Sequence, residues 1–335
     1  NAATANNATT KITNNEFINV RQGVYINSSA TLKTSKTALE SNIFGSTINT
    51  EKPSLPIYMI NTNYFTITNN AINGVLNDNT GNPSISGITI ENGSNYSIQR
   101  NTISDVILTT NHIIQYAILL SGTQTNGIIS ENKITNIKNT GNGIIRTLSL
   151  QMNAATSANI LVANNFISDI TTTGTTTNGA SGIQIQSGRN IKLYHNSVVL
   201  NGNQNNISAA LNINAGTELD VINNIFGNTS TTGTPYAVYS NVSASSFSNI
   251  DYNDYYSARH IGFLDSNRTT LANWQTATTK DRNSINVIPT FVSISDLHLS
   301  EANTHLNLLF DHFIENTLTF RMGQLFIVPI RRRKQ

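Results

Sequence analysis

The sequence predicts an all-β fold, a parallel β-helix in which the chain winds through about nine stacked coils. Three observations support this prediction. An asparagine recurs between apolar residues about every 30 positions, within the range of solenoid repeats. Short segments alternate apolar and other residues with a period of two, which is typical of strands with one buried face. Charged residues make up only 11% of the chain, while isoleucine, valine and leucine are spaced regularly.

The asparagine repeat consists of an apolar residue, two variable residues, asparagine, one variable residue and a second apolar residue. Ile98, Asn101 and Ile103 form one such unit. We expect each asparagine to adopt the left-handed conformation at a bend between two strands, because asparagine tolerates that conformation better than most residues. Stacked about 4.8 Å apart, the side-chain amides would form a hydrogen-bonded ladder. The repeat asparagines are Asn15, Asn42, Asn70, Asn101, Asn132, Asn165, Asn196, Asn224 and Asn253.

A second motif precedes many of these asparagines. It begins with a small residue and continues with alternating apolar residues, as in residues 87–90 (Gly-Ile-Thr-Ile) and 182–185 (Gly-Ile-Gln-Ile). Period-two alternation indicates a strand with one buried face. We therefore expect three short strands in each coil: the strand of this motif, the strand that ends before the asparagine and the strand that follows it.

These two motifs together resemble the right-handed parallel β-helix of the pectin-lyase-like superfamily, and above all its secreted bacterial repeat proteins. The resemblance covers about residues 10–307. It includes residues 251–256 (Asp-Tyr-Asn-Asp-Tyr-Tyr), Trp274 and residues 296–300, which are similar to the closing segment of such proteins. The resemblance implies a right-handed coil and a ligand site beside the Gly-Ile-x-Ile strands. It implies no particular reaction, because one fold serves many functions.

We expect the chain to divide into three segments. Residues 1–256 hold the β-helix repeats, and the abrupt start without methionine indicates that N-terminal coils are missing. Residues 257–307 should form a C-terminal cap, because an open last coil would expose apolar core and strand edges. In this cap we expect Thr270 to begin a short helix and Trp274 to be packed inside. Residues 308–335 are apolar and basic without the asparagine rhythm; we interpret them as a frameshift product, with a native hydrophobic segment as the alternative.

The composition limits the partners and the compartment. A net charge of +2 predicts no nucleic-acid partner, and no apolar run is long enough to predict a membrane span. The chain contains no cysteine and therefore neither a disulfide nor a thiolate metal site. An asparagine- and threonine-rich chain of this kind fits a secreted or cell-surface bacterial protein, and we expect a monomer.

The outward residues of the Gly-Ile-x-Ile strands form the predicted ligand face. This face is rich in amides, with tyrosines toward both ends and almost no charge. Amides can hydrogen-bond sugar hydroxyls and aromatic rings can stack on sugar rings, so we predict that it binds an extended polysaccharide or cell-surface glycan. The predicted ligand residues are Tyr25, Tyr58, Glu91, Gln184, Gln186, Asn212, Asn214 and Tyr239.

No catalytic residue is predicted on this face. A glycoside hydrolase needs two carboxylates within about 10 Å, and a lyase needs a base beside a neutralised carboxylate. Glu91 is the one acid that the alternation places there, and no basic residue aligns with it in neighbouring coils. His195 stands alone among asparagines at its position, and we interpret it as a surface residue. A lyase or hydrolase with catalytic residues on loops 77–84, 109–115 or 171–180 stays open as an alternative, as does a structural spacer.

Two further sets of residues are candidates for local interactions. Asp105, Asn136 and Asp169 follow repeat asparagines of successive coils by four residues. Stacked, they are candidate Ca²⁺ ligands, but aspartate and asparagine are also common turn residues, and we favour the turn. No cofactor is predicted. Directly before the asparagine, Arg100 and Glu131 of adjacent coils are expected to form an exposed ion pair.

Overall fold

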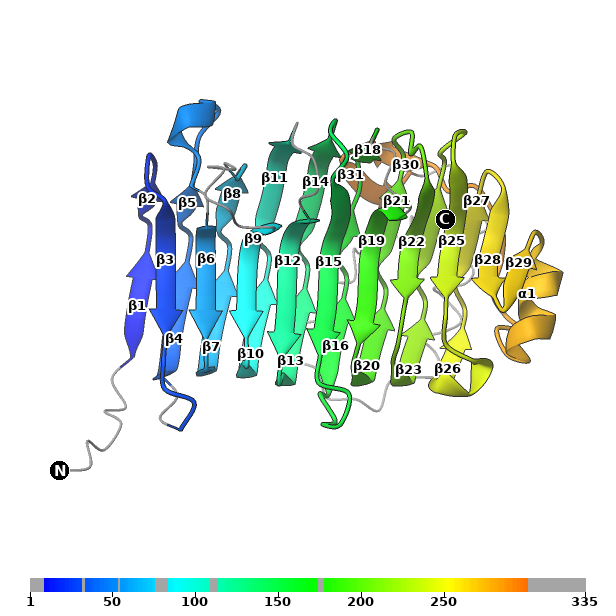
Figure 1. Cartoon of the computed structure of the whole chain (residues 1–335), viewed down its shortest axis with the longest axis horizontal. Coiled ribbons are helices and arrows are strands. Elements are labelled where there is room, and N and C mark those ends of the chain that lie inside the picture. The colour runs from blue at the N-terminus through cyan, green and yellow to red at the C-terminus, as the bar shows by residue number, and fades with distance from the viewer. Residues whose placement is uncertain are drawn as a thin grey trace, which may run out of the picture.

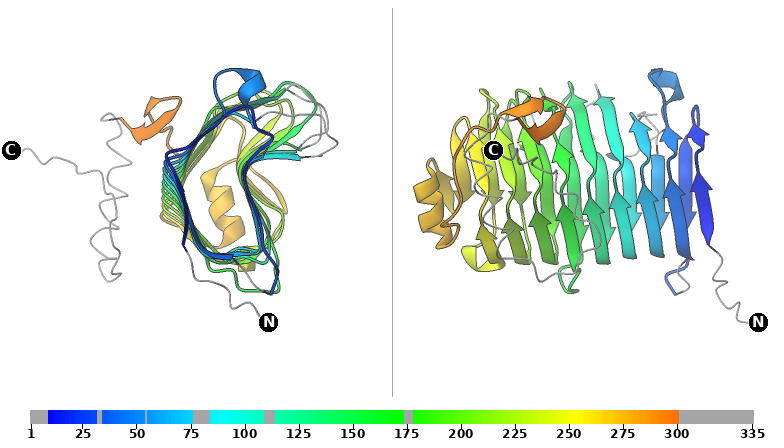
Figure 2. Two further views of the ribbon diagram at one scale, coloured as in Figure 1. Left: turned by 90° about the vertical axis from the view of Figure 1, so that its left-hand side faces the viewer. Right: turned by 180° about the vertical axis from the view of Figure 1, so that it is seen from behind.

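The computed structural model describes residues 9–31, 34–53, 55–75, 84–108, 114–173 and 178–300. These residues form a parallel β-solenoid, which confirms the predicted fold class. The chain winds through three long parallel sheets, and successive coils lie side by side along the solenoid axis (Figure 1). Viewed along that axis, the coils superpose closely (Figure 2). Residues 308–335, interpreted above as a frameshift product, lie outside the described residues.

Sheets A and B flank the repeat asparagines, and in both sheets the strands follow one another in chain order. Sheet A holds the strands that end before the asparagines: β1 (Thr10–Thr13), β4 (Thr34–Glu40), β7 (Thr62–Thr68), β10 (Ser94–Gln99), β13 (Thr125–Ser130), β16 (Ile160–Ala163), β20 (Arg189–Tyr194), β23 (Thr217–Ile222) and β26 (Phe247–Asp251). Sheet B holds the strands that follow them: β2 (Glu16–Phe17), β5 (Ile43–Phe44), β8 (Ala71–Asn73), β11 (Thr102–Leu108), β14 (Lys133–Asn139), β17 (Phe166–Ile167), β18 (Ile170–Thr172), β21 (Ser197–Leu200), β24 (Ile225–Asn228) and β27 (Asp254–Ser257).

Sheet C holds the strands of the Gly-Ile-x-Ile motif and carries the predicted ligand face. Its parallel strands are β3 (Gln22–Asn27), β6 (Leu55–Ile60), β9 (Ser84–Glu91), β12 (Ile114–Gly122), β15 (Ile144–Met152), β19 (Asn178–Ser187), β22 (Ile207–Ile213), β25 (Thr234–Ser240) and β28 (His260–Leu264). A last strand, β29 (Ser266–Arg268), pairs antiparallel with β28 and ends the sheet. Two short 3-10 helices, η1 (Asn49–Glu51) and η2 (Ala244–Ser246), interrupt the connections.

The core is a stack of apolar side chains inside the three sheets. On sheet C, Ile88, Ile118 and Leu148 pair in register and are 0% exposed. Burying one such side chain contributes about 1.5–3 kcal/mol, so the repeated row is a main source of stability. The motif begins with a small residue because a larger one would clash: a Cβ at Gly182 would meet the side chain of Val198 in sheet B.

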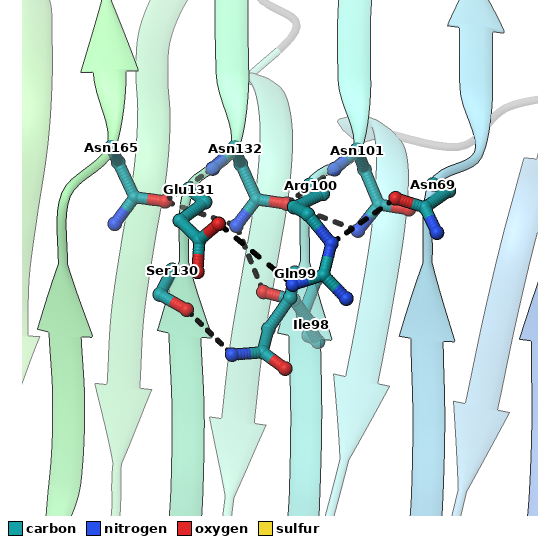
Figure 3. Close-up of polar contacts among 9 residues, drawn as sticks. All are labelled: Asn69, Ile98, Gln99, Arg100, Asn101, Ser130, Glu131, Asn132 and Asn165. Atoms are coloured by element: carbon teal, nitrogen blue, oxygen red, sulfur yellow. Dashed lines mark hydrogen bonds and ion pairs between the residues drawn. The ribbon is translucent and has the colours of Figure 1, made fainter. Parts of the chain in front are cut away.

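The asparagine ladder is present as predicted and includes all nine repeat asparagines. Asn132 is representative (Figure 3). Its Nδ2 donates to Asn165 Oδ1 at 3.0 Å and to the carbonyl of Ile98 at 2.9 Å, and its Oδ1 accepts from Asn101 Nδ2 at 3.0 Å. Every amide along the ladder therefore ties its own coil to a neighbouring one.

The left-handed residue of each bend is the residue before the ladder asparagine. Asn69, Arg100 and Glu131 have φ of 56°, 54° and 57°, whereas no ladder asparagine has a positive φ. The prediction that the ladder asparagines themselves adopt the left-handed conformation is therefore wrong. The repeat requires asparagine for its amide, which lies buried in the bend and must both donate and accept.

A second amide ladder, which the sequence analysis missed, follows the outer side of sheet A. Asn95 Nδ2 donates to Asn63 Oδ1 at 3.0 Å, Asn126 Nδ2 to Asn95 Oδ1 at 3.0 Å, and Asn159 Nδ2 to Asn126 Oδ1 at 2.9 Å. Asn95, Asn126 and Asn159 also have positive φ, so backbone conformation favours asparagine here. The ladder residues of sheet A therefore need no functional explanation.

The last coil is covered by helix α1 (Leu271–Thr278). Thr270 is its N-cap and accepts a hydrogen bond from the backbone N of Asn273 at 3.2 Å, as predicted. Trp274 is 0% exposed, which confirms that it packs in the cap. Its Nε1 donates to Asp281 Oδ2 at 2.6 Å, and the hydroxyl of Tyr255 donates to the same oxygen at 2.7 Å. This buried network joins the cap to strand β27.

Beyond the cap, Ser284 and Ile285 first extend sheet B past β27. Residues 287–300, here called the strap, then run back over the outer side of sheet B. The strap contains an antiparallel hairpin of β30 (Phe291–Ser293) and β31 (Asp296–Leu299). The backbone N of Val287 donates to Asp254 Oδ1 at 3.0 Å, and the ring of His298 lies 4.8 Å from that of Phe166. In Figure 2 the hairpin lies across several strands of the solenoid. The strap therefore covers sheet B, on a different side from the predicted ligand face.

Candidate ligand-binding face

Sheet C aligns the predicted ligand residues in one row along its outer side. Each residue of this row, here called the central row, is paired in register with the next. Eight steps of about 4.8 Å give the row a length of about 38 Å. In order, it contains Tyr25, Tyr58, Thr89, Leu119, Ser149, Gln184, Asn212, Tyr239 and Phe263. The structure thus brings five of the eight predicted residues into this line. Glu91 and Gln186 lie two residues further along their strands, and Asn214 directly follows the end of β22.

The middle of the central row is buried, although its residues point outward. Ser149, Gln184 and Asn212 are 0%, 3% and 8% exposed, whereas Tyr25 at the N-terminal end is 45% exposed. Gln186 is exposed, and Asn214 is half-buried. Two of the predicted ligand residues, Gln184 and Asn212, are therefore almost inaccessible to solvent. Accessible amides come mainly from the neighbouring positions.

The amides of the face bond to one another across coils. Gln184 Oε1 accepts from Ser149 Oγ at 3.0 Å, and Gln184 Nε2 donates to Gln186 Oε1 at 3.1 Å. Asn214 Nδ2 donates to the same Gln186 oxygen at 2.6 Å. Such mutual bonds fix the rotamers of the side chains, so the face presents a preorganised pattern of donors and acceptors.

The N-terminal end of the face combines two tyrosines with its one acid. The rings of Tyr25 and Tyr58 meet edge to face with centroids 5.5 Å apart. The hydroxyl of Tyr58 donates to Glu91 Oε2 at 3.1 Å. Burial, together with the hydrogen bond to Glu91, raises the pKa of Tyr58 to about 12. Glu91 is the one carboxylate within the strands of sheet C, so these strands supply no acid–base pair for glycoside hydrolysis.

At the C-terminal end, the structure adds an aromatic cluster that the sequence analysis only partly found. Tyr239 stacks on Phe263 with ring centroids 4.6 Å apart, and Tyr236 stacks on His260 at 5.1 Å. Tyr236 also meets Tyr239 edge to face at 5.1 Å. Continuing the period-two alternation into residues 260–264 would have placed Phe263 in the central row. Tyr236 and His260 precede the motif's small residue and gave no such signal.

Two further residues of the outer side were missed for the same reason. Tyr116 and Arg146 lie before the small residue of their strands, and both are less than 10% exposed. Tyr116 accepts a hydrogen bond from Gln151 Nε2 at 3.0 Å. Burial lowers the pKa of Arg146 to about 10, and the guanidinium donates to the carbonyl of Ile145 at 2.9 Å. A cation therefore lies on the outer side of sheet C, two strands from Glu91.

The candidate calcium ligands occupy turn positions. Asp105, Asn136 and Asp169 have φ of 58°, 56° and 53°, so each residue has a backbone reason to be aspartate or asparagine. Asn136 Nδ2 donates to Asp105 Oδ1 at 2.5 Å, whereas Asp169 pairs with Lys138 at 3.3 Å. Within the described ranges no three histidine, aspartate or glutamate side chains gather around one point.

The residues before the ladder asparagines behave as local surface groups. Arg100 and Glu131 form the predicted ion pair at 3.8 Å, and Arg100 Nε also donates to Asn69 Oδ1 at 3.2 Å (Figure 3). His195 is half-buried rather than fully exposed, and burial lowers its pKa. Its φ of 55° places it at the same left-handed position as Arg100.

The loops that carry the alternative enzyme hypothesis lie largely outside the described residues, which leave out 76–83, 109–113 and 174–177. In the part of the chain that is described, no helix has the length and apolar character needed to cross a membrane. Comparison with known proteins found no matching family model, no similar curated protein and no similar solved structure.

Proposed function

We propose that this protein binds an extended glycan along the outer side of sheet C, outside the cell or at its surface. The observation that carries the proposal is the central row, about 38 Å of aligned positions with aromatic residues at both ends, together with the accessible amides of Gln186 and Asn214 beside it. A polymer of sugar rings offers hydroxyls for the amides and apolar ring faces for the aromatic residues. A small ligand would use only a fraction of this length.

The chemistry of the face favours binding over hydrolysis. Glu91 is the one carboxylate of the sheet C strands, and its carboxylate accepts from Tyr58. Hydrogen bonds among the amides fix their side-chain rotamers, so the face is preorganised for a ligand. Membership of the pectin-lyase-like superfamily of right-handed β-helices is part of this proposal, and that resemblance supports the fold and the location of the ligand face.

The test is retention of the full chain by immobilised polysaccharides, with released sugar ends measured in the same tubes. Tyr25→Ala removes an exposed ring from the proposed face, and Tyr64→Ala is the matched control, because Tyr64 is 58% exposed on sheet A. We expect retention without new sugar ends, weakened by Tyr25→Ala and unchanged by Tyr64→Ala. Release of new sugar ends would show that the protein is an enzyme. If none of the immobilised polysaccharides retained the protein, the proposal would be contradicted.

A further inference from the structure

The N-terminal end of the ligand face carries aromatic and polar side chains that a ligand can reach. Tyr25 is 45% exposed, Asn27 is exposed, and Tyr58 and Glu91 are half-buried. Tyr25 pairs in register with Tyr58, while Asn27, Ile60 and Glu91 form the neighbouring row, two residues further along their strands. All these residues belong to β3, β6 and β9, so they span about 10 Å along the solenoid axis.

The contacts within this group leave part of it free for a ligand. The hydroxyl of Tyr58 donates to Glu91 Oε2 at 3.1 Å, and Asn27 Nδ2 donates to the hydroxyl of Tyr25 at 3.3 Å. In the described part of the chain Glu91 Oε1 accepts no hydrogen bond, and the atom is accessible to solvent. A ligand hydroxyl can therefore donate to Glu91 Oε1 while an apolar ring face packs against the exposed ring of Tyr25.

The described strands around Glu91 supply no cation to neutralise it. Strands β3, β6, β9 and β12 contain no lysine, arginine or histidine, and neither do residues 28–31 and 92–93, which follow β3 and β9. A ligand group packed against Tyr25 would lie within about 10 Å of Glu91, the distance over which exposed charges interact at about 0.1 M salt. A sugar carboxylate would be repelled there, whereas a sugar hydroxyl would find an acceptor.

From this juxtaposition we infer that Tyr25, Asn27 and Glu91 form a subsite for one sugar ring without an acidic group, and that Glu91 determines this selectivity. The sugar ring packs against the ring of Tyr25 and donates one hydroxyl to Glu91 Oε1, and the amide of Asn27 binds a neighbouring hydroxyl. The inference rests on the proposed function and narrows the glycan, because the unpaired charge of Glu91 disfavours an acidic sugar at this end of the face.

The test is affinity electrophoresis of the full chain in gels that contain one polymer of a matched pair. The pairs are hydroxyethylcellulose with carboxymethylcellulose, and carboxyl-reduced polygalacturonate with polygalacturonate, so that each backbone is offered in a neutral and an acidic form. We expect the neutral form of at least one pair to retard the protein more strongly than the acidic form. Tyr25→Ala should weaken the affinity for that neutral form about fivefold, as is usual for an aromatic residue that anchors a ligand.

Glu91→Gln isolates the effect of the charge, because the amide keeps the size of the side chain and an acceptor for Tyr58. Two like charges about 8 Å apart, at an effective dielectric constant of about 40, lower the affinity about fivefold. Glu91→Gln should therefore reduce the preference for the neutral form about fivefold at low salt. Glu91→Asp keeps the charge and should keep the preference. Glu16→Gln is the matched control, because it removes an equal charge from the exposed side of β2 in sheet B.

Equal or stronger retardation by the acidic form in both pairs would overturn the inference, as would a preference that Glu91→Gln leaves unchanged. Equal retardation of the unmodified protein and Tyr25→Ala would also overturn it. In these cases glycan binding itself would stand. If no polymer of either pair retards the protein, the inference fails, and the immobilised polysaccharides then decide the proposed function separately. All substituted side chains are accessible, and thermal unfolding of each variant checks that the fold is kept.

Discussion

Asp254 makes the junction between the last coil and the strap sensitive to pH. Its side chain is 2% exposed, Oδ1 accepts one hydrogen bond from the backbone N of Val287, and Oδ2 has no partner among the described residues. Neither β24, which pairs with β27, nor residues 285–290, which pair with Asp254 and hydrogen-bond to it, contain a lysine, arginine or histidine. Burial without a cation raises the pKa of this carboxyl from 3.8 to about 7.

The sign and size of the effect follow from proton linkage. Well below pH 4 the carboxyl of Asp254 is protonated in both the folded and the unfolded chain, so Asp254 does not destabilise the fold. Between pH 4 and pH 7 the unfolded chain releases the proton while the folded chain keeps it, so stability falls as pH rises. Each pKa unit corresponds to about 1.4 kcal/mol, so Asp254 destabilises the folded state by up to about 4 kcal/mol above pH 7.

Asp254→Asn removes this dependence, because the amide is similar in shape and neutral at every pH. Trp274, the single tryptophan, lies in the adjacent cap, so its fluorescence in urea reports unfolding of this end. We expect the unmodified protein to unfold at lower urea at pH 8 than at pH 5, and Asp254→Asn to reduce that difference. Part of the difference should persist, because burial also raises the pKa of Asp281. An unchanged pH dependence in Asp254→Asn would refute the reasoning.

Three further changes test the fold. Asn132→Ala removes side-chain hydrogen bonds to both neighbouring coils and should lower the free energy of unfolding, measured in urea, by about 3 kcal/mol. Asn15→Ala, at the first coil, should lower it by less than about 1 kcal/mol. Tyr96 has a fully buried hydroxyl without a partner among the described residues, so Tyr96→Phe should leave the melting temperature unchanged or raise it by a few degrees. Trp274→Ala leaves a cavity in the cap and should lower the free energy of unfolding, measured by circular dichroism, by about 3–5 kcal/mol.

The periodic features of the fold could be predicted from the sequence because they repeat. Each ladder asparagine stands between apolar residues in a fixed pattern, so Asn101 and Asn132 could be aligned without any structure. The cap helix was predictable from local signals, with Thr270 before a helical segment. The conformation at the bend was not predictable, because the pattern marks the buried amide and leaves the residue before it free to be Asn69, Arg100 or Glu131.

The details of the ligand face were less predictable, because they depend on contacts between coils. Alternation placed Tyr58, Gln184 and Tyr239 on the outer side correctly. It could not predict that Gln184 is nearly buried, or that Tyr236 reaches the face from a position before the motif. The strap is unpredictable for the same reason, since Asp254 and Val287 are brought together only by the tertiary fold.

The most direct test of the proposed face is hydroxyl-radical footprinting of the full chain with and without a bound polysaccharide. Tyr25 and Tyr239 lie at opposite ends of the central row, and Tyr64 lies on sheet A. If the polymer follows sheet C, both row tyrosines lose reactivity while Tyr64 keeps it. Equal protection of Tyr64, or no protection of Tyr25 and Tyr239 at saturating polysaccharide, would contradict binding along this face.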